Sequence, residues 1–176
     1  DFADVASFSM EFWMKSSATP SEPMVVIGRD EDSNFTQYWL GILTDGTVRM
    51  ELRDYGNNSL SVEGGSVLNG NWHHVVATYD ASSNDAKLYV DKALVGESNA
   101  NLLNFGSDNP LSIGCLDNGG AQLFWYEGIL DELAFYNTAL NSTIVTENYD
   151  AAVAGNGACI FNYAPLILSP PDTAVN

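Results

Sequence analysis

Basic residues are scarce in this sequence, whereas acidic residues are abundant. The 176 residues include six Lys and Arg against 23 Asp and Glu, which gives a formal net charge of −17. A field of that sign repels nucleic acid and anionic membrane surfaces, so neither is expected as a partner, and it attracts cations such as calcium. The same acidity can also serve only to keep an extracellular or salt-tolerant protein soluble, and both explanations stay open.

Cysteine and long apolar runs are also rare. The two cysteines, Cys115 and Cys159, exclude a disulfide-rich scaffold but allow one bridge in an oxidising compartment. We expect that bridge, which would hold the C-terminal tail against the domain; two separate buried thiols are the alternative. No apolar run reaches the ~20 residues of a membrane span, and nothing in the given residues resembles a signal peptide. Because the chain does not begin with Met, we expect an excerpt of a longer protein with neighbouring domains.

Recognised catalytic motifs are missing. The histidines His73 and His74 are adjacent, and no G-x-S-x-G or H-E-x-x-H pattern surrounds them. In a strand, one of these side chains would face the core and the other the solvent. The sequence also contains no phosphate-binding loop, no C-x-x-C pair and no dinucleotide fingerprint. We therefore predict that the chain is not an enzyme.

The sequence is rich in short β-forming runs. They recur about every ten residues between Gly, Asn, Asp and Ser, which is typical of an all-β antiparallel sandwich or jelly roll. One short helix is expected at residues 142–149, capped by Asn141 or Ser142. The expected strands are Phe8–Met14, Met24–Gly28, Tyr38–Leu43, Thr47–Leu52, Leu60–Val62, His73–Tyr79, Lys87–Val90, Leu111–Gly114 and Ile129–Tyr136.

Three segments in order resemble the laminin-G-like branch of the concanavalin A-like lectins and glucanases. Phe8–Lys15 reads FSMEFWMK, Asn71–Val95 contains WHHVVATYD and LYVDKALV, and Tyr126–Leu140 reads YEGILDELAFYNTAL. The resemblance implies a jelly-roll β-sandwich, and we expect one domain over residues 1–168 with a linker or tail over 169–176. Lys92 stands where this family usually has Gly, which predicts a different turn type at that hairpin.

Three carboxylates crowd the segment WYEGILDELAFYN, at Glu127, Asp131 and Glu132. A retaining glycosidase needs two carboxyl groups about 5–5.5 Å apart. In a regular strand Glu127 and Asp131 would lie about 13 Å apart, and Asp131 and Glu132 would point to opposite faces. This spacing argues against glycoside hydrolysis. Glu132 is expected either to be an outward-facing strand residue or to form a hydrogen bond with a neighbouring turn, and not to be catalytic.

Calcium offers another use for the acidic residues. It takes about six to eight oxygen ligands, commonly presented by loops, and the chain has two acidic loops, GRDEDSN and CLDNGGAQ. The family resemblance implies that Asp131 and acidic loop residues serve calcium, whereas a structural Asp131 that accepts backbone N–H bonds is the alternative. The expected ligands are Asp131, Asp117, Asp30, Asp32 and Asn118.

Sugar binding is the function that the resemblance favours. Sandwich lectins hold a pyranose against an aromatic side chain and bind its hydroxyls with amides or carboxylates. Trp13, Trp72 and Phe135 are expected in the core. The expected ligand-binding residues are Tyr38, Tyr55, Asn57, Asn58 and Trp125.

We therefore predict a non-catalytic carbohydrate-binding module of a secreted or cell-surface protein, assisted by calcium. A structural or adhesive module that binds an extracellular protein is the alternative, and a glycoside hydrolase is a distant third.

Overall fold

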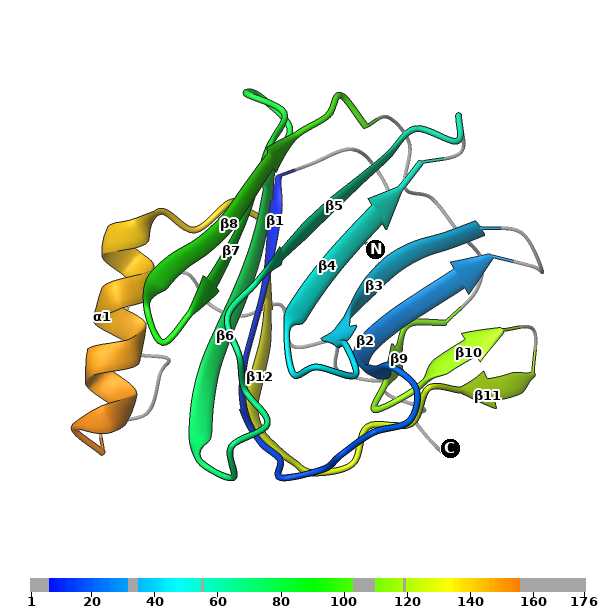
Figure 1. Ribbon diagram of the computed structural model, residues 1–176. Coiled ribbons are helices and arrows are strands. Elements are labelled where there is room, and N and C mark those ends of the chain that lie inside the picture. Colours follow the sequence, from blue (N-terminus) through cyan, green and yellow to red (C-terminus); the bar gives the residue numbers. More distant parts are fainter. Residues whose placement is uncertain (1–6, 32–34, 55, 103–109, 119, 156–176) are drawn as a thin grey trace, which may run out of the picture.

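The computed structural model describes residues 7–31, 35–54, 56–102, 110–118 and 120–155, which form a β-sandwich with one helix (Figure 1). The helix α1 spans Ser142–Val153. Twelve strands precede it: β1 Phe8–Lys15, β2 Met24–Glu31, β3 Phe35–Ile42, β4 Val48–Arg53, β5 Ser59–Gly64, β6 Trp72–Asp80, β7 Asp85–Val90, β8 Ala93–Asn99, β9 Ser112–Ile113, β10 Leu116–Asn118, β11 Ala121–Leu123 and β12 Ile129–Tyr136.

Two antiparallel sheets form the layers of the sandwich. The first sheet has the order β12-β1-β6-β7-β8, and the second sheet has the order β5-β4-β3-β2-β9. The strands β10 and β11 form a separate hairpin. Successive side chains of a strand point to opposite faces, so each sheet buries one face against the other. On β4, for example, Val48, Met50 and Leu52 are buried, while Arg49, Glu51 and Arg53 are partly exposed.

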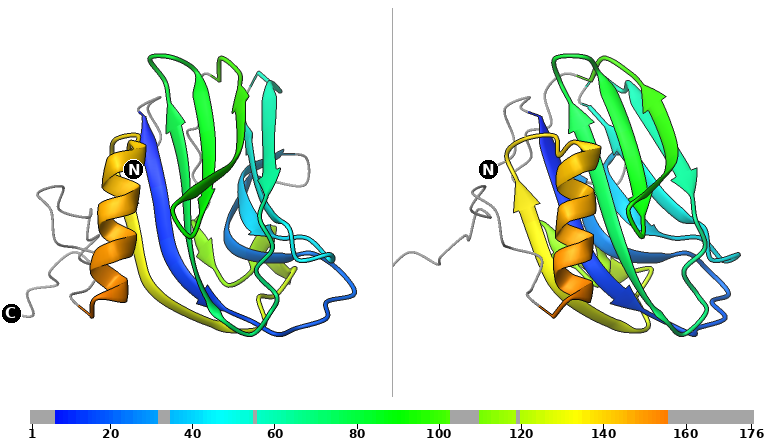
Figure 2. Two further views of the ribbon diagram at one scale, coloured as in Figure 1. Left: turned by 60° about the vertical axis from the view of Figure 1, so that its left-hand side comes forward. Right: turned by 90° about the vertical axis from the view of Figure 1, so that its left-hand side faces the viewer.

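The helix α1 covers the outer face of the first sheet (Figure 2). The side chain of Asn141 caps it by accepting hydrogen bonds from the backbone N–H groups of Thr143 and Ile144, both at 3.0 Å. Beneath the helix lies a second apolar cluster. Its buried members are Val76, Tyr89, Ala134, Tyr136, Leu140 and Val145. Among the described residues, the first sheet is therefore covered on both faces, and the helix that covers its outer face ends at Val153.

The predicted fold class is confirmed, and every predicted strand overlaps an observed one. The strands β8, β10 and β11 were not predicted; β8 reads ALVGESN and lacks the alternation of a half-buried strand. At the β7–β8 hairpin, Asp91 and Lys92 both have positive φ, 49° and 62°. This is the pattern of a type I′ turn, so Lys92 occupies a conformation that glycine adopts more easily.

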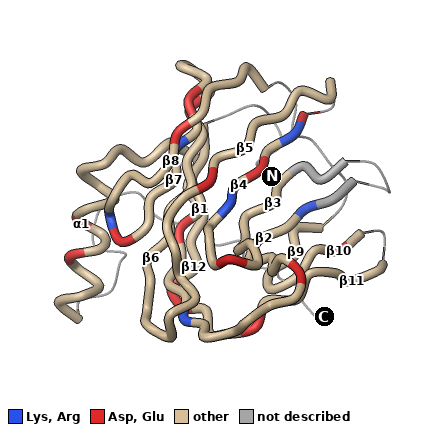
Figure 3. The backbone as a smooth tube through the Cα atoms, in the orientation of Figure 1, with Lys and Arg blue, Asp and Glu red and all other residues tan. Residues whose placement is uncertain are grey.

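Acidic residues lie on both sheets, and the few basic residues are scattered among them (Figure 3). Within the described ranges, no helix is long and apolar enough to cross a membrane.

Candidate functional site

Tyr38 does not form the sugar platform that was predicted for it. Its side chain is 3% exposed, and its ring packs edge-on against Phe8 with the centroids 5.5 Å apart. On β3 it shares the inward face with Leu40 and Ile42, which are also buried. Burial raises the pKa of the Tyr38 hydroxyl. Tyr38 is therefore a core residue, and its prediction as a ligand contact is wrong.

The turn between β4 and β5 holds two of the predicted amides. Tyr55, the predicted platform, lies outside the described residues. Asn57 and Asn58 are exposed, and Asn57 has a positive φ of 64°. Asn58 donates to the Asp54 carboxylate from its backbone N–H at 2.8 Å and from its side-chain amide at 2.9 Å. Asn58 therefore has a structural contact in this turn, and a sugar contact from these amides stays a prediction.

The other predicted platform, Trp125, is 59% exposed between β11 and β12. Its role in binding stays a prediction. Cys115 is buried and has no disulfide among the described residues, while its expected partner Cys159 falls outside them. The disulfide likewise stays a prediction.

The predicted calcium ligands come from different parts of the sandwich. Asp117 and Asn118 lie on the β10–β11 hairpin, where Asp117 accepts the Gly120 backbone N–H at 2.8 Å. Asp131 lies on β12 in the first sheet. The described residues contain no cluster of three or more His, Cys, Asp or Glu side chains that could hold a metal. Asp32 lies outside the description, as does the side chain of Asp30, so a calcium site stays a prediction.

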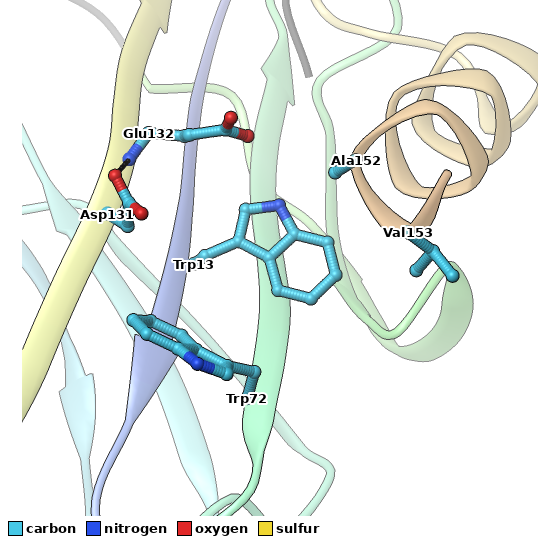
Figure 4. Close-up of a pocket in the computed structure, with 6 residues that line it drawn as sticks. All are labelled: Trp13, Trp72, Asp131, Glu132, Ala152 and Val153. Atoms are coloured by element: carbon cyan, nitrogen blue, oxygen red, sulfur yellow. Dashed lines mark hydrogen bonds between the residues drawn. The ribbon is translucent and has the colours of Figure 1, made fainter. Parts of the chain in front are cut away.

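A cavity of about 250 Å³ opens on the outer face of the first sheet, at the C-terminal end of α1 (Figure 4). We call it the tryptophan cavity. Its lining residues are Trp13, Trp72, Asp131, Glu132, Ala152 and Val153.

Strand register explains why these residues meet. Trp13 on β1 pairs with His74 on β6 and with Asp131 on β12, so these three side chains share the outer face of the sheet. Trp72 precedes His74 by two residues and therefore lies on the same face. The last turn of α1 adds Ala152 and forms the opposite wall.

A β-bulge brings the two acidic residues into the same cavity. Glu11 pairs with Ala134 and Trp13 with Asp131, so β12 has one more residue than β1 in this interval. At the bulge Glu132 has a positive φ of 48°, and its backbone N–H donates to Oδ1 of Asp131 at 2.8 Å. The prediction that Asp131 and Glu132 point to opposite faces is therefore wrong, because both line the tryptophan cavity.

The two tryptophans differ in exposure. Trp72 is 41% exposed, so its prediction as a core residue is wrong. Trp13 is partly buried and stacks on Tyr149 of α1, with the centroids 5.5 Å apart and an interplanar angle of 24°. Its indole Nε1 is buried and has no hydrogen-bond partner among the described residues. In Figure 4 this nitrogen lies on the side of the ring that faces Glu132 and Ala152.

A buried polar network beside Trp13 fixes this part of the site. Nε2 of His74 lies 2.6 Å from Oε1 of Glu11, and the Asn148 amide donates to both Glu11 oxygens at 3.1 and 3.0 Å. All three residues are buried. Because Asn148 belongs to α1 and Glu11 to β1, the network holds the helix on the sheet and so fixes the far wall of the cavity.

The neighbouring His73 is also structural. It is 8% exposed, and its ring nitrogens lie 2.7 Å from Oδ2 of Asp91 and 2.9 Å from Oδ1 of Asn69. The prediction that one of the two histidines faces solvent is wrong, because loop residues cover His73 and the helix covers His74.

A second concavity, of about 240 Å³, lies on the outer face of the second sheet. Trp39, Arg49, Glu51 and Phe124 contribute to its lining. The Arg49 guanidinium lies 5.9 Å from the centroid of the Trp39 ring, pairs with Glu51 and approaches Glu63 at 3.5 Å. The arginine charge is thus balanced by carboxylates, which leaves this concavity without a strong positive field.

Solved structures with a similar fold include a CBM40 module, a sialidase and a pentraxin. The CBM40 module of the Ruminococcus gnavus IT-sialidase, solved with alpha2,3 sialyllactose, has 17% identity and a TM-score of 0.69, and the match covers 81% of this chain and 82% of that one. The K499G mutant of the NanB sialidase from Streptococcus pneumoniae has the same identity and TM-score, covering 80% of this chain. A SAP-like pentraxin from Limulus polyphemus follows with 16% identity and a TM-score of 0.64, over 84% of this chain and 71% of that one.

At these identities the likeness concerns the fold, and the chain spans only 23% of the length of the NanB sialidase. Comparison with curated protein sequences gives no significant match. A family model, however, matches residues 1–146, which is most of the chain. This match and the observed sandwich agree with the resemblance read from the sequence, and the chain belongs to the concanavalin A-like lectin/glucanases superfamily.

Proposed function

We propose that this chain is a non-catalytic carbohydrate-binding module and that the tryptophan cavity is its sugar site. One observation carries the proposal: an exposed tryptophan, a buried indole donor and two carboxylates line a single cavity on a rigid sheet. Its volume of about 250 Å³ lies just below the range of roughly 300–1,000 Å³ for drug-sized ligands, which suits one sugar ring. The solved CBM40 module supports the same class of function by analogy of fold.

The lining residues suit the chemistry of a pyranose. The C–H face of a sugar ring can lie on the exposed indole of Trp72, while its hydroxyls donate to Asp131 and Glu132. A ligand oxygen would also satisfy Nε1 of Trp13, and an unsatisfied buried donor costs about 1–3 kcal/mol.

Binding fits the cavity better than hydrolysis does. A glycosidase needs its acid and its base or nucleophile on either side of the scissile bond. Asp131 and Glu132 are consecutive residues of one edge strand and lie together on one wall, opposite α1 (Figure 4). They can hold one side of a sugar, and the described lining has no carboxylate on the other side of the cavity.

Substitution of Trp72 tests the proposal. The Trp72→Ala variant should lose at least tenfold in affinity for the glycans that the unaltered chain binds on a glycan array, since stacking on this indole is lost. Trp125→Ala is the matched control, because Trp125 is also exposed but does not line the cavity. Equal losses in both variants, or a loss only in Trp125→Ala, would move the site away from the cavity. No binding to any glycan would favour the adhesive, protein-binding alternative.

Calcium dependence and an extracellular location are further parts of this proposal. Running the same array with calcium and with a chelator separates a calcium-assisted site from an independent one. Release of reducing sugar during incubation with the bound glycans would instead reveal a hydrolase.

A further inference from the structure

We infer that the sugar held in the tryptophan cavity carries a positively charged amino group, as glucosamine does. This inference rests on the proposed function and adds the chemical class of the ligand to it. It follows from the charges around the cavity, from the aromatic surface inside it, and from the contrast with the ligand of the solved CBM40 module.

The charged side chains that line the cavity are carboxylates. Asp131 and Glu132 are both exposed, and no Lys or Arg of the described ranges belongs to the lining. A carboxylate close to an ammonium group forms a charge-assisted hydrogen bond, which is stronger than a bond to a neutral hydroxyl. Glu132 is held there by backbone with positive φ, a conformation that is unfavourable for a non-glycine residue. The fold thus maintains this placement of a second carboxylate against a local conformational preference.

The basic groups on the neighbouring elements lie outside the cavity. Lys15 on β1 is the cross-strand partner of Trp72 and shares its face of the sheet, but it does not line the cavity. Lys92 lies 2.6 Å from Asp150 and 4.9 Å from the centroid of the Tyr149 ring, so its charge is already partnered. With a net charge of −17 for the whole chain, the surrounding field also favours a cationic ligand.

The tryptophans add a second attraction for a cation. An ammonium group within about 6 Å of an indole face is attracted by the ring quadrupole, and tryptophan is the strongest partner for this contact. A sugar stacked on Trp72 would place a ring substituent between this indole and the acidic wall of β12 (Figure 4). An amino group in that position meets both the carboxylates and the aromatic surface.

An acidic sugar fits the site poorly. Sialyllactose, with which the Ruminococcus gnavus module was solved, carries a carboxylate that would face Asp131 and Glu132 here. The second sheet does not offer a clear alternative, because Arg49 and Arg53 both contact Glu51. We therefore expect this chain to differ from that relative in ligand charge.

Calorimetric titration with matched trisaccharides tests the inference. The probes are the trimer of glucosamine, the trimer of N-acetylglucosamine and sialyllactose, at pH 6, where the free amines are charged. The glucosamine trimer should bind at least tenfold more tightly than its acetylated form, and sialyllactose should not bind. Raising the salt concentration should weaken only the binding of the amine, because ions screen an exposed charge pair.

The double variant Asp131→Asn, Glu132→Gln separates the charge from the platform. It should remove the preference for the free amine, whereas Glu22→Gln, at an exposed acid on the β1–β2 connection, should leave it unchanged. The new amide at position 131 keeps an oxygen that can accept the backbone N–H of position 132, so the bulge should persist.

Equal binding of both trimers, or a preference for the acetylated trimer or sialyllactose, would overturn the inference and leave the proposed function standing. If no trisaccharide binds and Trp72→Ala changes no array signal, the proposed function itself fails.

Discussion

Replacing Glu11 by Ala should destabilise this domain more than any other single acid-to-alanine change at a described position. Glu11 is fully buried, with 0% of its surface exposed, and it accepts bonds from His74 and from the Asn148 amide. The truncation would leave the His74 N–H and the Asn148 amide buried without their acceptor. Each unsatisfied buried group costs about 1–3 kcal/mol.

For the two groups together we therefore expect the free energy of unfolding to fall by about 2–6 kcal/mol, a large part of the ~5–15 kcal/mol typical of a domain. Urea unfolding followed by tryptophan fluorescence measures it, and Trp13, whose ring centroid lies 5.1 Å from that of His74, reports on the network directly. Glu63→Ala is the control, because Glu63 is 47% exposed and its contact with Arg49 is a surface ion pair worth ~0–1 kcal/mol.

The same substitution should also weaken glycan binding, since α1 supplies one wall of the cavity. If the free energy of unfolding of Glu11→Ala falls by less than about 1 kcal/mol, the buried network does not hold α1 on the sheet.

Three further predictions concern a helix cap, a buried tyrosine and a close backbone approach. Asn141→Ala removes the acceptor for two N–H groups of α1 and should lower the unfolding free energy by about 1 kcal/mol, measurable as a drop in Tm, whereas Asn141→Asp should change it little. Burial raises the pKa of Tyr126 to about 12, so this tyrosine ionises at a lower pH in the unfolded chain than in the folded one. Its contribution to stability is therefore complete below pH ~10 and is lost as the pH rises toward 12. In that pH window the unfolding free energy of Tyr126→Phe should fall less with pH than that of the unaltered chain. Gly41→Ala would place a methyl group 2.1 Å from the Met24 carbonyl oxygen, so β2 and β3 would have to separate. The variant should show a lower midpoint of urea unfolding or no folded fraction, and an unchanged midpoint would contradict this packing.

Local patterns in the sequence were sufficient to predict most of the fold. The alternation in VRMELR predicts the buried and exposed sides of β4, and the Asn-Ser-Thr start of α1 predicts its cap. The same alternation could have excluded Tyr38 as a platform, because Tyr38 shares its strand face with Leu40 and Ile42. The strand β8 was missed because packing against β7 determines it, and its own sequence has no apolar alternation.

The candidate site depends on contacts that no local pattern contains. Trp72 and Val153 line the same cavity, and nothing in the local sequence around Trp72 indicates that it lies beside the end of α1. Asp131 and Glu132 share a cavity only because β12 gains one residue against β1 at the bulge. A period of two residues predicts opposite faces for consecutive side chains, and a one-residue insertion reverses that prediction. The acidic pair therefore became a candidate sugar site through the pairing of two strands more than 100 residues apart in sequence, as the Trp13–Asp131 pair shows.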